Sequence, residues 1–206
     1  MSEEFEARAG APQQPPQEGA EEQEKLPQEE LFYWLQTLVT AIVCIVLVFT
    51  FLGRITRVVG HSMDDTLADG ELLAVWSLGY EPEQGDIVVL NKTTVEHLGG
   101  VAIVKRVIAT GGQTVDIDYA TNSVYVDGER LDEPYIKEVM QDVTLTDPYR
   151  AQTHIEVPEG SIFVMGDNRN NSDDSRDDRI GCIDEDYVLG KVFFSIFPFD
   201  TFGPME

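Results

Sequence analysis

The apolar and polar positions divide this chain into three stretches. Residues 1–30 are rich in Glu, Gln and Pro and have almost no large apolar side chains, residues 31–53 carry no charge, and residues 54–206 alternate short apolar runs with turn residues. A stretch like the first cannot bury enough surface to offset the entropy of ordering the chain. We therefore expect residues 1–30 to be a disordered acidic tail.

The uncharged stretch Leu31–Gly53 predicts one transmembrane helix. It has 23 residues, and a helix of that length rises about 34 Å, enough to cross a hydrocarbon core. Tyr33 and Trp34 at its start suit the membrane interface, and Arg54 and Arg57 follow its end. A cleavable signal peptide is the alternative, but the acidic leader and the long apolar run disfavour it.

The remaining stretch, residues 54–206, predicts a mainly β domain. Its apolar runs are four to nine residues long and are separated by Gly, Pro and Asp-Gly turn signals, and no helical periodicity of useful length appears. The predicted strands are Glu71–Ser77, Asp86–Leu90, Val101–Ile108, Thr114–Asp118, Ser123–Val126, Ser161–Met165 and Val188–Ile196. With about 150 residues in this part, we expect one compact domain with a single sizeable core.

Charge and cysteine content exclude several classes of function. The formal net charge is -24, with nine acids against two bases before Leu31 and 29 acids against 12 bases from Arg54 onward. Nucleic acid is therefore not expected as a partner, because binding phosphate requires a basic face. Cys44 lies in the apolar stretch and Cys182 far away in the β domain, so neither a disulfide nor a thiolate metal site is expected.

Ser62 and Lys105 are the candidate catalytic residues. A serine hydroxyl attacks poorly at neutral pH unless a base removes its proton, and a desolvated lysine can serve as that base. In the predicted strand Val101–Ile108, alternation places Lys105 among apolar side chains, and burial there would lower its pKa. His61 is next to Ser62, but neighbouring residues of an extended segment point to opposite faces, so His61 receives no catalytic role.

The polar stretch Asp167–Asp178 could be mistaken for a calcium-binding loop. The spacing does not fit, because Arg169 stands at the third position, Ser172 at the sixth, where glycine is required, and Asp178 at the twelfth, where glutamate is required. No metal is expected there.

We interpret the same stretch as support for the lysine. In this hypothesis Ser172 hydrogen-bonds to the amine of Lys105, and Asp174 pairs with Arg176 to hold the loop. Such contacts would orient the base toward the serine hydroxyl.

The order and type of four motifs resemble the type I signal peptidases, over most of residues 58–198. The motifs are Ser62-Met63 with Thr66-Leu67, Gly85–Val89, Lys105–Ile108, and Gly166–Arg176. The resemblance implies that Ser62 is the nucleophile, Lys105 the general base, Ser172 the residue that orients the lysine, and Asp174 and Arg176 supporting residues. It also implies an oxyanion hole made by the Ser62 backbone amide, helped by the residue two before it, here Gly60, which has no hydroxyl.

The resemblance further implies a membrane-anchored enzyme of the short, single-span form. The cytoplasmic tail would be residues 1–30, the transmembrane helix 31–53, and the extracytoplasmic peptidase domain of antiparallel β-sheets 54–206. Its substrates would be secreted preproteins, cut after a small-x-small sequence, with membrane lipid and the protein translocation machinery as neighbours. No cofactor is expected. The flanking charges by themselves would place the domain in the cytosol, so its outward placement rests on the resemblance.

Two departures from the family pattern and two alternatives accompany this interpretation. Asp65 stands where the family usually has proline, and Ala109–Gln113 replaces its usual Gly-x-Pro-Gly-Asp. One alternative is a dedicated serine-lysine protease that cleaves itself or a regulatory protein. The other is a catalytically silent, membrane-anchored β domain that binds extended peptides or organises an assembly.

Overall fold

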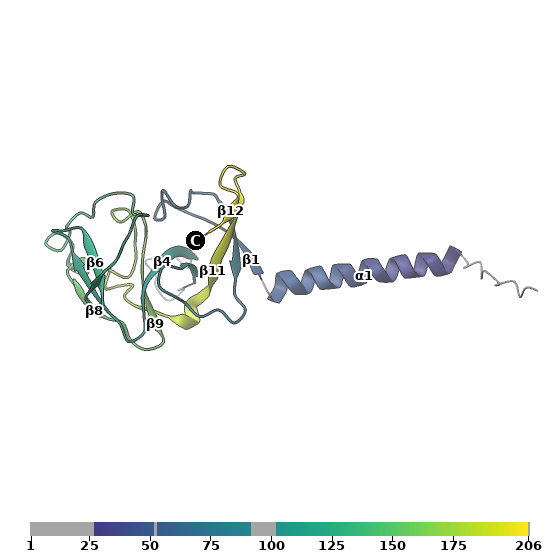
Figure 1. The fold of residues 1–206 in the computed structure, drawn as a ribbon, viewed down its shortest axis with the longest axis horizontal. Helices are drawn as coiled ribbons and strands as arrows, with labels where there is room; N and C mark the ends of the chain where they lie inside the picture. The colour runs from purple at the N-terminus through teal and green to yellow at the C-terminus, as the bar shows by residue number, and fades with distance from the viewer. Residues whose placement is uncertain (1–26, 52, 92–101, 206) are drawn as a thin grey trace, which may run out of the picture. The chain divides into compact units, whose positions relative to one another are not determined.

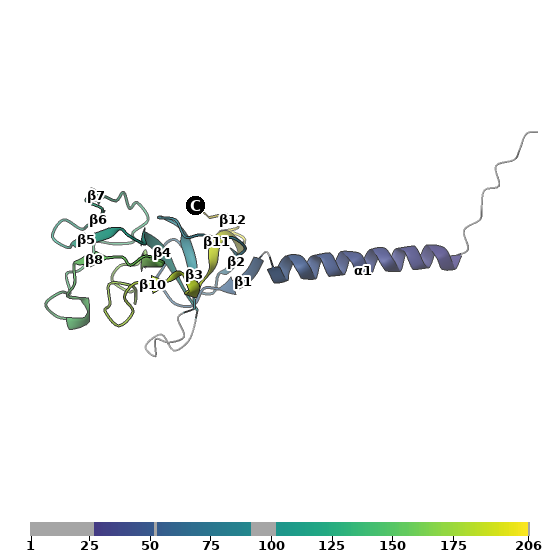
Figure 2. The ribbon, with the colours of Figure 1, turned by 90° about the horizontal axis from the view of Figure 1, so that it is seen from below.

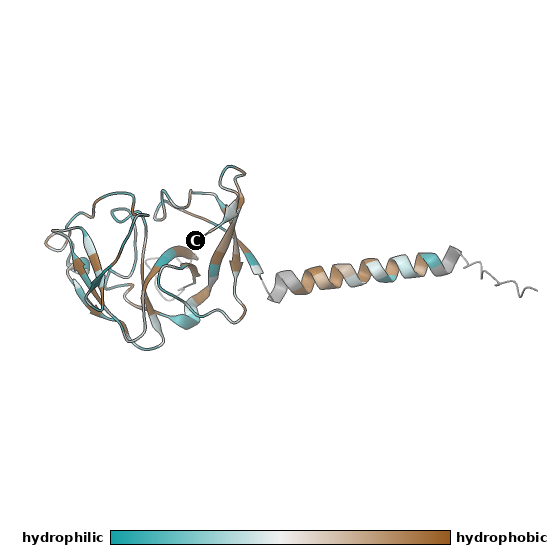
Figure 3. Ribbon diagram, in the orientation of Figure 1, coloured by the Kyte–Doolittle hydropathy of each residue, from teal (hydrophilic) through white to brown (hydrophobic). Residues whose placement is uncertain are grey.

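The computed structural model describes residues 27–51, 53–91 and 102–205. Its one α-helix, α1, covers Pro27–Phe51, begins before the predicted Leu31 and would measure about 37 Å at 1.5 Å per residue. The segment Glu30–Leu47 is long and apolar enough to cross a membrane, and none of it is buried; Figure 3 shows the brown, apolar colouring concentrated toward the C-terminal end of this helix. The predicted disordered tail, apart from its last residues, lies outside the described residues.

A large antiparallel sheet forms the centre of the β domain (Figure 1). Its strands, in spatial order, are β1 (Gly53–Arg57), β2 (Leu72–Trp76), β11 (Val188–Phe197), β3 (Ile87–Leu90), β4 (Ile103–Thr110), β9 (Ser161–Met165) and β10 (Ile183–Asp184). Strand β12 (Gly203–Pro204) pairs with β11 outside this order. The central pairing of β3 with β4 sets Val88 opposite Lys105 and Ile87 opposite Arg106.

A smaller antiparallel sheet lies at the other end of the domain from β1 and β2 (Figure 2). It contains, in spatial order, β7 (Glu129–Arg130), β6 (Ser123–Val126), β5 (Thr114–Asp118) and β8 (His154–Glu156). Two short 3₁₀ turns, η2 (Pro148–Arg150) and η3 (Glu185–Tyr187), complete the described elements.

The mainly β, antiparallel fold predicted from the sequence is confirmed. Each of the seven predicted runs contains a strand, although β4 begins at Ile103 and continues to Thr110, beyond the predicted end, and Val101 lies outside the described residues. The sequence pattern missed β1, β7, β8, β10 and β12. Four of these strands have only two or three residues, too few to show a clear alternation of apolar and polar positions. The fifth, β1, begins at Gly53, which the sequence analysis assigned to the end of the transmembrane helix.

The buried side chains form three clusters rather than the single core that the chain length predicts. The physical reason is that β3 and most of β4 are buried on both faces, so apolar side chains pack on each side of them. One cluster includes Val58, Met63 and Leu67, together with Leu73 of β2 and Val104 of β4. This packing anchors the loop that carries Ser62 against the strand that carries Lys105.

Candidate active site

Ser62 and Lys105 meet in the folded domain although 43 positions separate them in the chain. Lys105 Nζ lies 2.6 Å from Ser62 Oγ, a hydrogen-bond distance, and 3.2 Å from the carbonyl oxygen of Val104. Ser62 lies in a series of turns between β1 and β2, where Leu67 N donates a hydrogen bond to Met63 O at 2.8 Å. The contact between Lys105 Nζ and Ser62 Oγ has the geometry required of a base and its nucleophile.

Lys105 sits in surroundings that favour its neutral form. Only 3% of the residue is exposed, and burial lowers the pKa of Lys105 to about 8, with the negative charge of Asp174 opposing part of the shift. Removing an ammonium group from water disfavours the charged form, so a useful fraction of the amine is unprotonated near neutral pH. A neutral amine beside a hydroxyl can accept its proton.

Asp174 and Arg176 form a buried ion pair beside the lysine. Arg176 Nε donates to Asp174 Oδ1 at 2.8 Å and Nη2 donates to Oδ2 at 2.8 Å, and the Gly166 amide donates to the same carboxylate at 3.0 Å. Burial alone would raise the pKa of Asp174, but Arg176 outweighs it and holds that pKa below its usual range. The carboxylate therefore stays charged and fixes the loop after β9.

Ser172 does not make the hydrogen bond to the Lys105 amine that the sequence analysis expected. Its hydroxyl is buried and makes no hydrogen bond to any of the residues that the structure describes, including Lys105. It lies close enough to Asp174 to help lower that carboxylate's pKa, but not in the stricter geometry of a hydrogen bond. It also packs tightly against Gly166, where an added Cβ would collide with Ser172 Oγ and with the carbonyl oxygen of Ser62.

A second buried ion pair ties β4 to the Ser62 loop. Arg106 Nε and Nη2 donate to the two carboxylate oxygens of Asp167 at 2.9 and 2.8 Å, and Nη1 donates to Gly85 O at 2.8 Å. Thr66 Oγ1 donates to the same carboxylate at 2.5 Å. The sequence did not indicate that Asp167 and Arg106 are partners.

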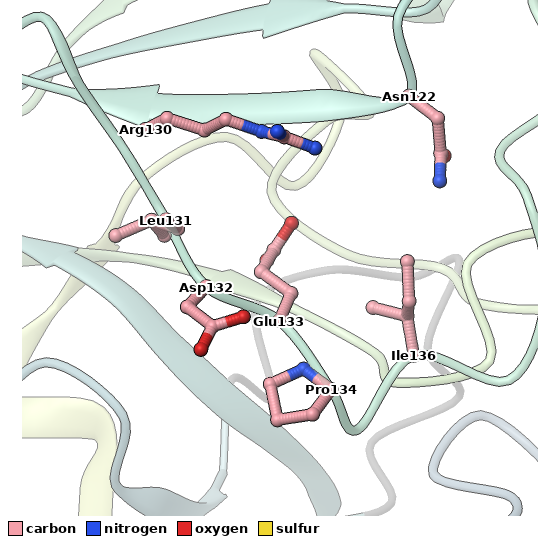
Figure 4. A pocket seen from close by; sticks show the side chains of 7 residues that line it. All are labelled: Asn122, Arg130, Leu131, Asp132, Glu133, Pro134 and Ile136. Atoms are coloured by element: carbon pink, nitrogen blue, oxygen red, sulfur yellow. The ribbon is translucent and has the colours of Figure 1, made fainter.

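The segment after β7 covers this ion pair. The guanidinium of Arg106 lies 4.0 Å from the centre of the Tyr135 ring, and Tyr135 donates to Glu133, which pairs with Arg169. Glu133 also borders a pocket of about 350 Å³, in which the side chains of Arg130, Glu133 and Asn122 point toward a common space (Figure 4). Neither Ser62 nor Lys105 lines this pocket.

His61 and Gly60 precede Ser62 and differ in what they contact. Residues 61–66 form turns rather than the extended segment assumed in the sequence argument, and His61 Nδ1 lies 3.4 Å from Asp64 Oδ2 at the surface. Gly60 adopts a positive φ of 94°, and its amide donates to Asp69 Oδ1 at 2.8 Å. In this structure the Gly60 amide is thus already engaged, and its part in an oxyanion hole stays a prediction.

A serine hydroxyl within hydrogen-bond distance of a buried lysine amine is the arrangement that a hydrolase with lysine as its general base would require. Residues 31–197 match the family described as signal peptidase, peptidase S26. The chain therefore belongs to the signal peptidase family.

Two relatives with similar sequences agree with this assignment. A signal peptidase I from Bacillus licheniformis is 37% identical over 188 residues, covering 87% of this chain and 96% of that protein. A signal peptidase IB from Staphylococcus aureus is 34% identical over 187 residues, covering 84% of this chain and 93% of that protein. A crystal structure of a signal peptidase I from Enterococcus faecalis is 29% identical, with a TM-score of 0.42, and covers 55% of this chain and 97% of that one.

Proposed function

We propose that this protein is a membrane-bound serine endopeptidase that removes N-terminal signal peptides from secreted preproteins with a Ser62-Lys105 dyad. The observation that carries the proposal is the 2.6 Å approach of the buried Lys105 amine to the Ser62 hydroxyl. Membership of the signal peptidase family supports the substrate class and the expected cut after a small-x-small sequence.

The proposed mechanism transfers the acyl group of the substrate first to serine and then to water. Ser62 Oγ attacks the scissile carbonyl carbon while Lys105 Nζ takes the hydroxyl proton, and Lys105 then gives that proton to the leaving amine. A water molecule then attacks the ester carbonyl and gives a proton to Lys105, which passes it to Ser62 Oγ as the ester C–O bond breaks and the signal peptide leaves with a free carboxyl group. The Ser62 backbone amide would stabilise the oxyanion formed in both steps.

Ser172, Asp174 and Arg176 have supporting parts in this proposal. Asp174 keeps a negative charge near Lys105 and is itself held by Arg176. Ser172 and the carbonyl oxygen of Ser62 both lie close to Gly166, so Ser172 would support the dyad by packing. No cofactor takes part in the proposed steps.

We further propose that α1 anchors the protein in the plasma membrane with the β domain on the extracytoplasmic side. The length and apolar character of Glu30–Leu47 support anchoring, and secreted preproteins are processed where they emerge. Protease added to spheroplasts should digest the β domain of the full chain. Complete protection of that domain until the membrane is broken would contradict the proposed side.

The decisive experiment is cleavage of a secretory preprotein in detergent by the full chain, with the cut position read by mass spectrometry. The wild type should cut after a small-x-small sequence, and Ser62→Ala and Lys105→Met should not cut. Ser123→Ala and Lys191→Met are matched controls, because Ser123 lies in the small sheet and Lys191 pairs with Asp86.

The outcomes separate the proposal from its alternatives. If Ser62→Ala and Lys105→Met cut as well as the wild type, the serine-lysine mechanism is wrong. If the wild type cuts no member of a panel of preproteins, a dedicated protease or a silent peptide-binding domain becomes the better interpretation.

A further inference from the structure

Asn168 holds the backbone on both sides of the Ser62 α-carbon. Its side-chain Nδ2 donates to the carbonyl oxygen of His61 at 2.9 Å, and its backbone N–H donates to the carbonyl oxygen of Ser62 at 3.0 Å. Only 5% of Asn168 is exposed. One residue from the loop after β9 therefore contacts the two successive peptide groups that flank the candidate nucleophile.

The bond to His61 has a consequence for the Ser62 amide. The His61 carbonyl and the Ser62 N–H belong to one planar peptide group, and this bond is not among the cis peptides of the described chain. In a trans peptide the C=O and the N–H point in opposite directions, so fixing the carbonyl also fixes the direction of the N–H. A hydrogen bond accepted by the carbonyl also polarises the N–H at the other side of the group.

The backbone amide of Ser62 is free to donate a hydrogen bond to an oxyanion. No residue that the structure describes accepts a hydrogen bond from it, whereas the nearby Gly60 amide donates to Asp69. Donors aimed in advance at a developing oxyanion are the ones that contribute most to rate, because they do not have to reorient during the reaction. A free amide on a chain of turns needs a contact that keeps it aimed.

From this geometry we infer that Asn168 is a positioning residue that aims the Ser62 amide at the oxyanion of the acyl-transfer step. The inference rests on the proposed function, in which Ser62 is the nucleophile. Asn168 does not touch the substrate carbonyl; it acts through the peptide group of His61 and Ser62. This role is distinct from that of Asp174, which acts on the charge around Lys105.

The surroundings of Asn168 make the contact testable by a small change. Its Oδ1 is buried without a hydrogen-bond partner among the described residues, so Nδ2 to His61 is the side chain's recorded hydrogen bond. Asn168→Asp keeps the shape but replaces the donor with an oxygen that repels the His61 carbonyl, and Asn168→Ala removes the contact without adding charge. Asn170→Asp is the matched control, because Asn170 Nδ2 donates to Val139 O at 2.9 Å from the same loop.

The experiment compares these variants with the wild type and Ser62→Ala on one preprotein, after thermal melting has shown which variants are folded. We expect Asn168→Asp and Asn168→Ala to lower kcat by about tenfold to a hundredfold, below the 10²–10³ lost when an oxyanion donor is removed outright. KM and the midpoint of the pH profile should stay unchanged. Asn170→Asp should keep wild-type kcat.

A thioamide at the scissile bond separates oxyanion positioning from a general structural role. Sulfur is a weak hydrogen-bond acceptor, so the wild type should strongly prefer the oxygen substrate, and the Asn168 variants should show a smaller preference. Unchanged kcat in both Asn168 variants would overturn the inference. A lowered kcat would also overturn the inference if the ratio of cleavage rates on the oxygen and thioamide substrates stayed unchanged. A lowered kcat with a shifted pH profile would overturn it as well, because Asn168 would then act on Lys105 and not on the oxyanion.

A measurement without substrate keeps this inference separate from the proposed function. If the wild type cuts no preprotein, the proposed function fails, but hydrogen-deuterium exchange at the Leu67 amide, which donates to Met63 O within the turns that carry Ser62, still reports whether Asn168 holds that segment in the full chain. Faster exchange in both Asn168 variants than in Asn170→Asp supports the positioning contact. Equal exchange in all of them contradicts it.

Discussion

At the scale of single residues, the activity should follow the protonation state of Lys105. Burial lowers the pKa of its amine to about 8, and only the neutral amine can accept the Ser62 proton. We therefore expect kcat/KM to rise about tenfold per pH unit below this pKa and to level off above it. A pH profile of kcat/KM for the free enzyme checks this, and a flat profile across pH 8 would contradict a lysine base.

The same pKa predicts a stability gain when the amine is removed. The lysine pKa is about 8 in the folded chain against 10.5 for an ordinary lysine, so between these values the unfolded chain binds more protons and stability rises with pH. Below pH 8 the folded state carries the full free-energy cost of burying the protonated Lys105 amine, on the order of 3 kcal/mol. Lys105→Met should melt at a higher temperature than the wild type at pH 7.

The control for that comparison is Lys191→Met, whose amine pairs with Asp86 and is partly exposed. It should not raise the melting temperature. A Lys105→Met chain that melts at or below the wild-type temperature at pH 7 would show that the buried amine carries no such penalty.

Gly166 matters because of the space around it. A Cβ there would collide with the Ser62 carbonyl oxygen and the Ser172 hydroxyl, so Gly166→Ala should displace the loop that carries Ser62. Overpacking of this kind costs about 1–3 kcal/mol, and we expect preprotein cleavage to fall by more than tenfold. Gly203→Ala is the control, since a Cβ there meets open space; equal cleavage rates in the two variants would refute this prediction.

At the scale of elements, β4 both presents Lys105 and anchors the loop after β9. Arg106 donates three hydrogen bonds, two of them to the buried Asp167, so Arg106→Ala leaves an uncompensated buried charge. Such a loss typically costs about 3–5 kcal/mol. We expect a lower melting temperature for Arg106→Ala, and partial recovery when Asp167→Asn is added. If the losses of unfolding free energy caused by Arg106→Ala and by Asp167→Asn simply add in the double variant, the two residues do not stabilise each other.

At the scale of the whole molecule, α1 should account for membrane attachment. Removing residues 1–51 leaves the β domain with its three core clusters intact, and we expect this shorter chain to stay in the supernatant when vesicles are floated, while the full chain floats. The β domain also exposes apolar side chains, including Phe199, which is 81% exposed. Flotation of the shorter chain would mean that these side chains, and not α1 alone, bind lipid.

The sequence by itself determined the features that depend on local pattern. An uncharged run sets the helix, alternation of apolar and polar positions sets most strands, and both follow from the geometry of a single element. Ser62 and Lys105 were also predicted as the catalytic pair without coordinates, because their motifs resemble those of a known family, and that role stays a prediction. The acidic charge and the distant positions of the two cysteines led us to expect neither a nucleic-acid partner nor a disulfide, and both expectations stay predictions.

Only the tertiary structure decided which side chains meet. The partner of Asp167 is Arg106, 61 positions away, and Asn168 reaches His61 across 107 positions; no periodicity in the sequence encodes such pairs. Ser172 was expected at the lysine amine, but its hydroxyl lies against Gly166 instead. These contacts depend on how strands and loops pack in three dimensions, and a distance of a few tenths of an ångström separates a hydrogen bond from a near neighbour.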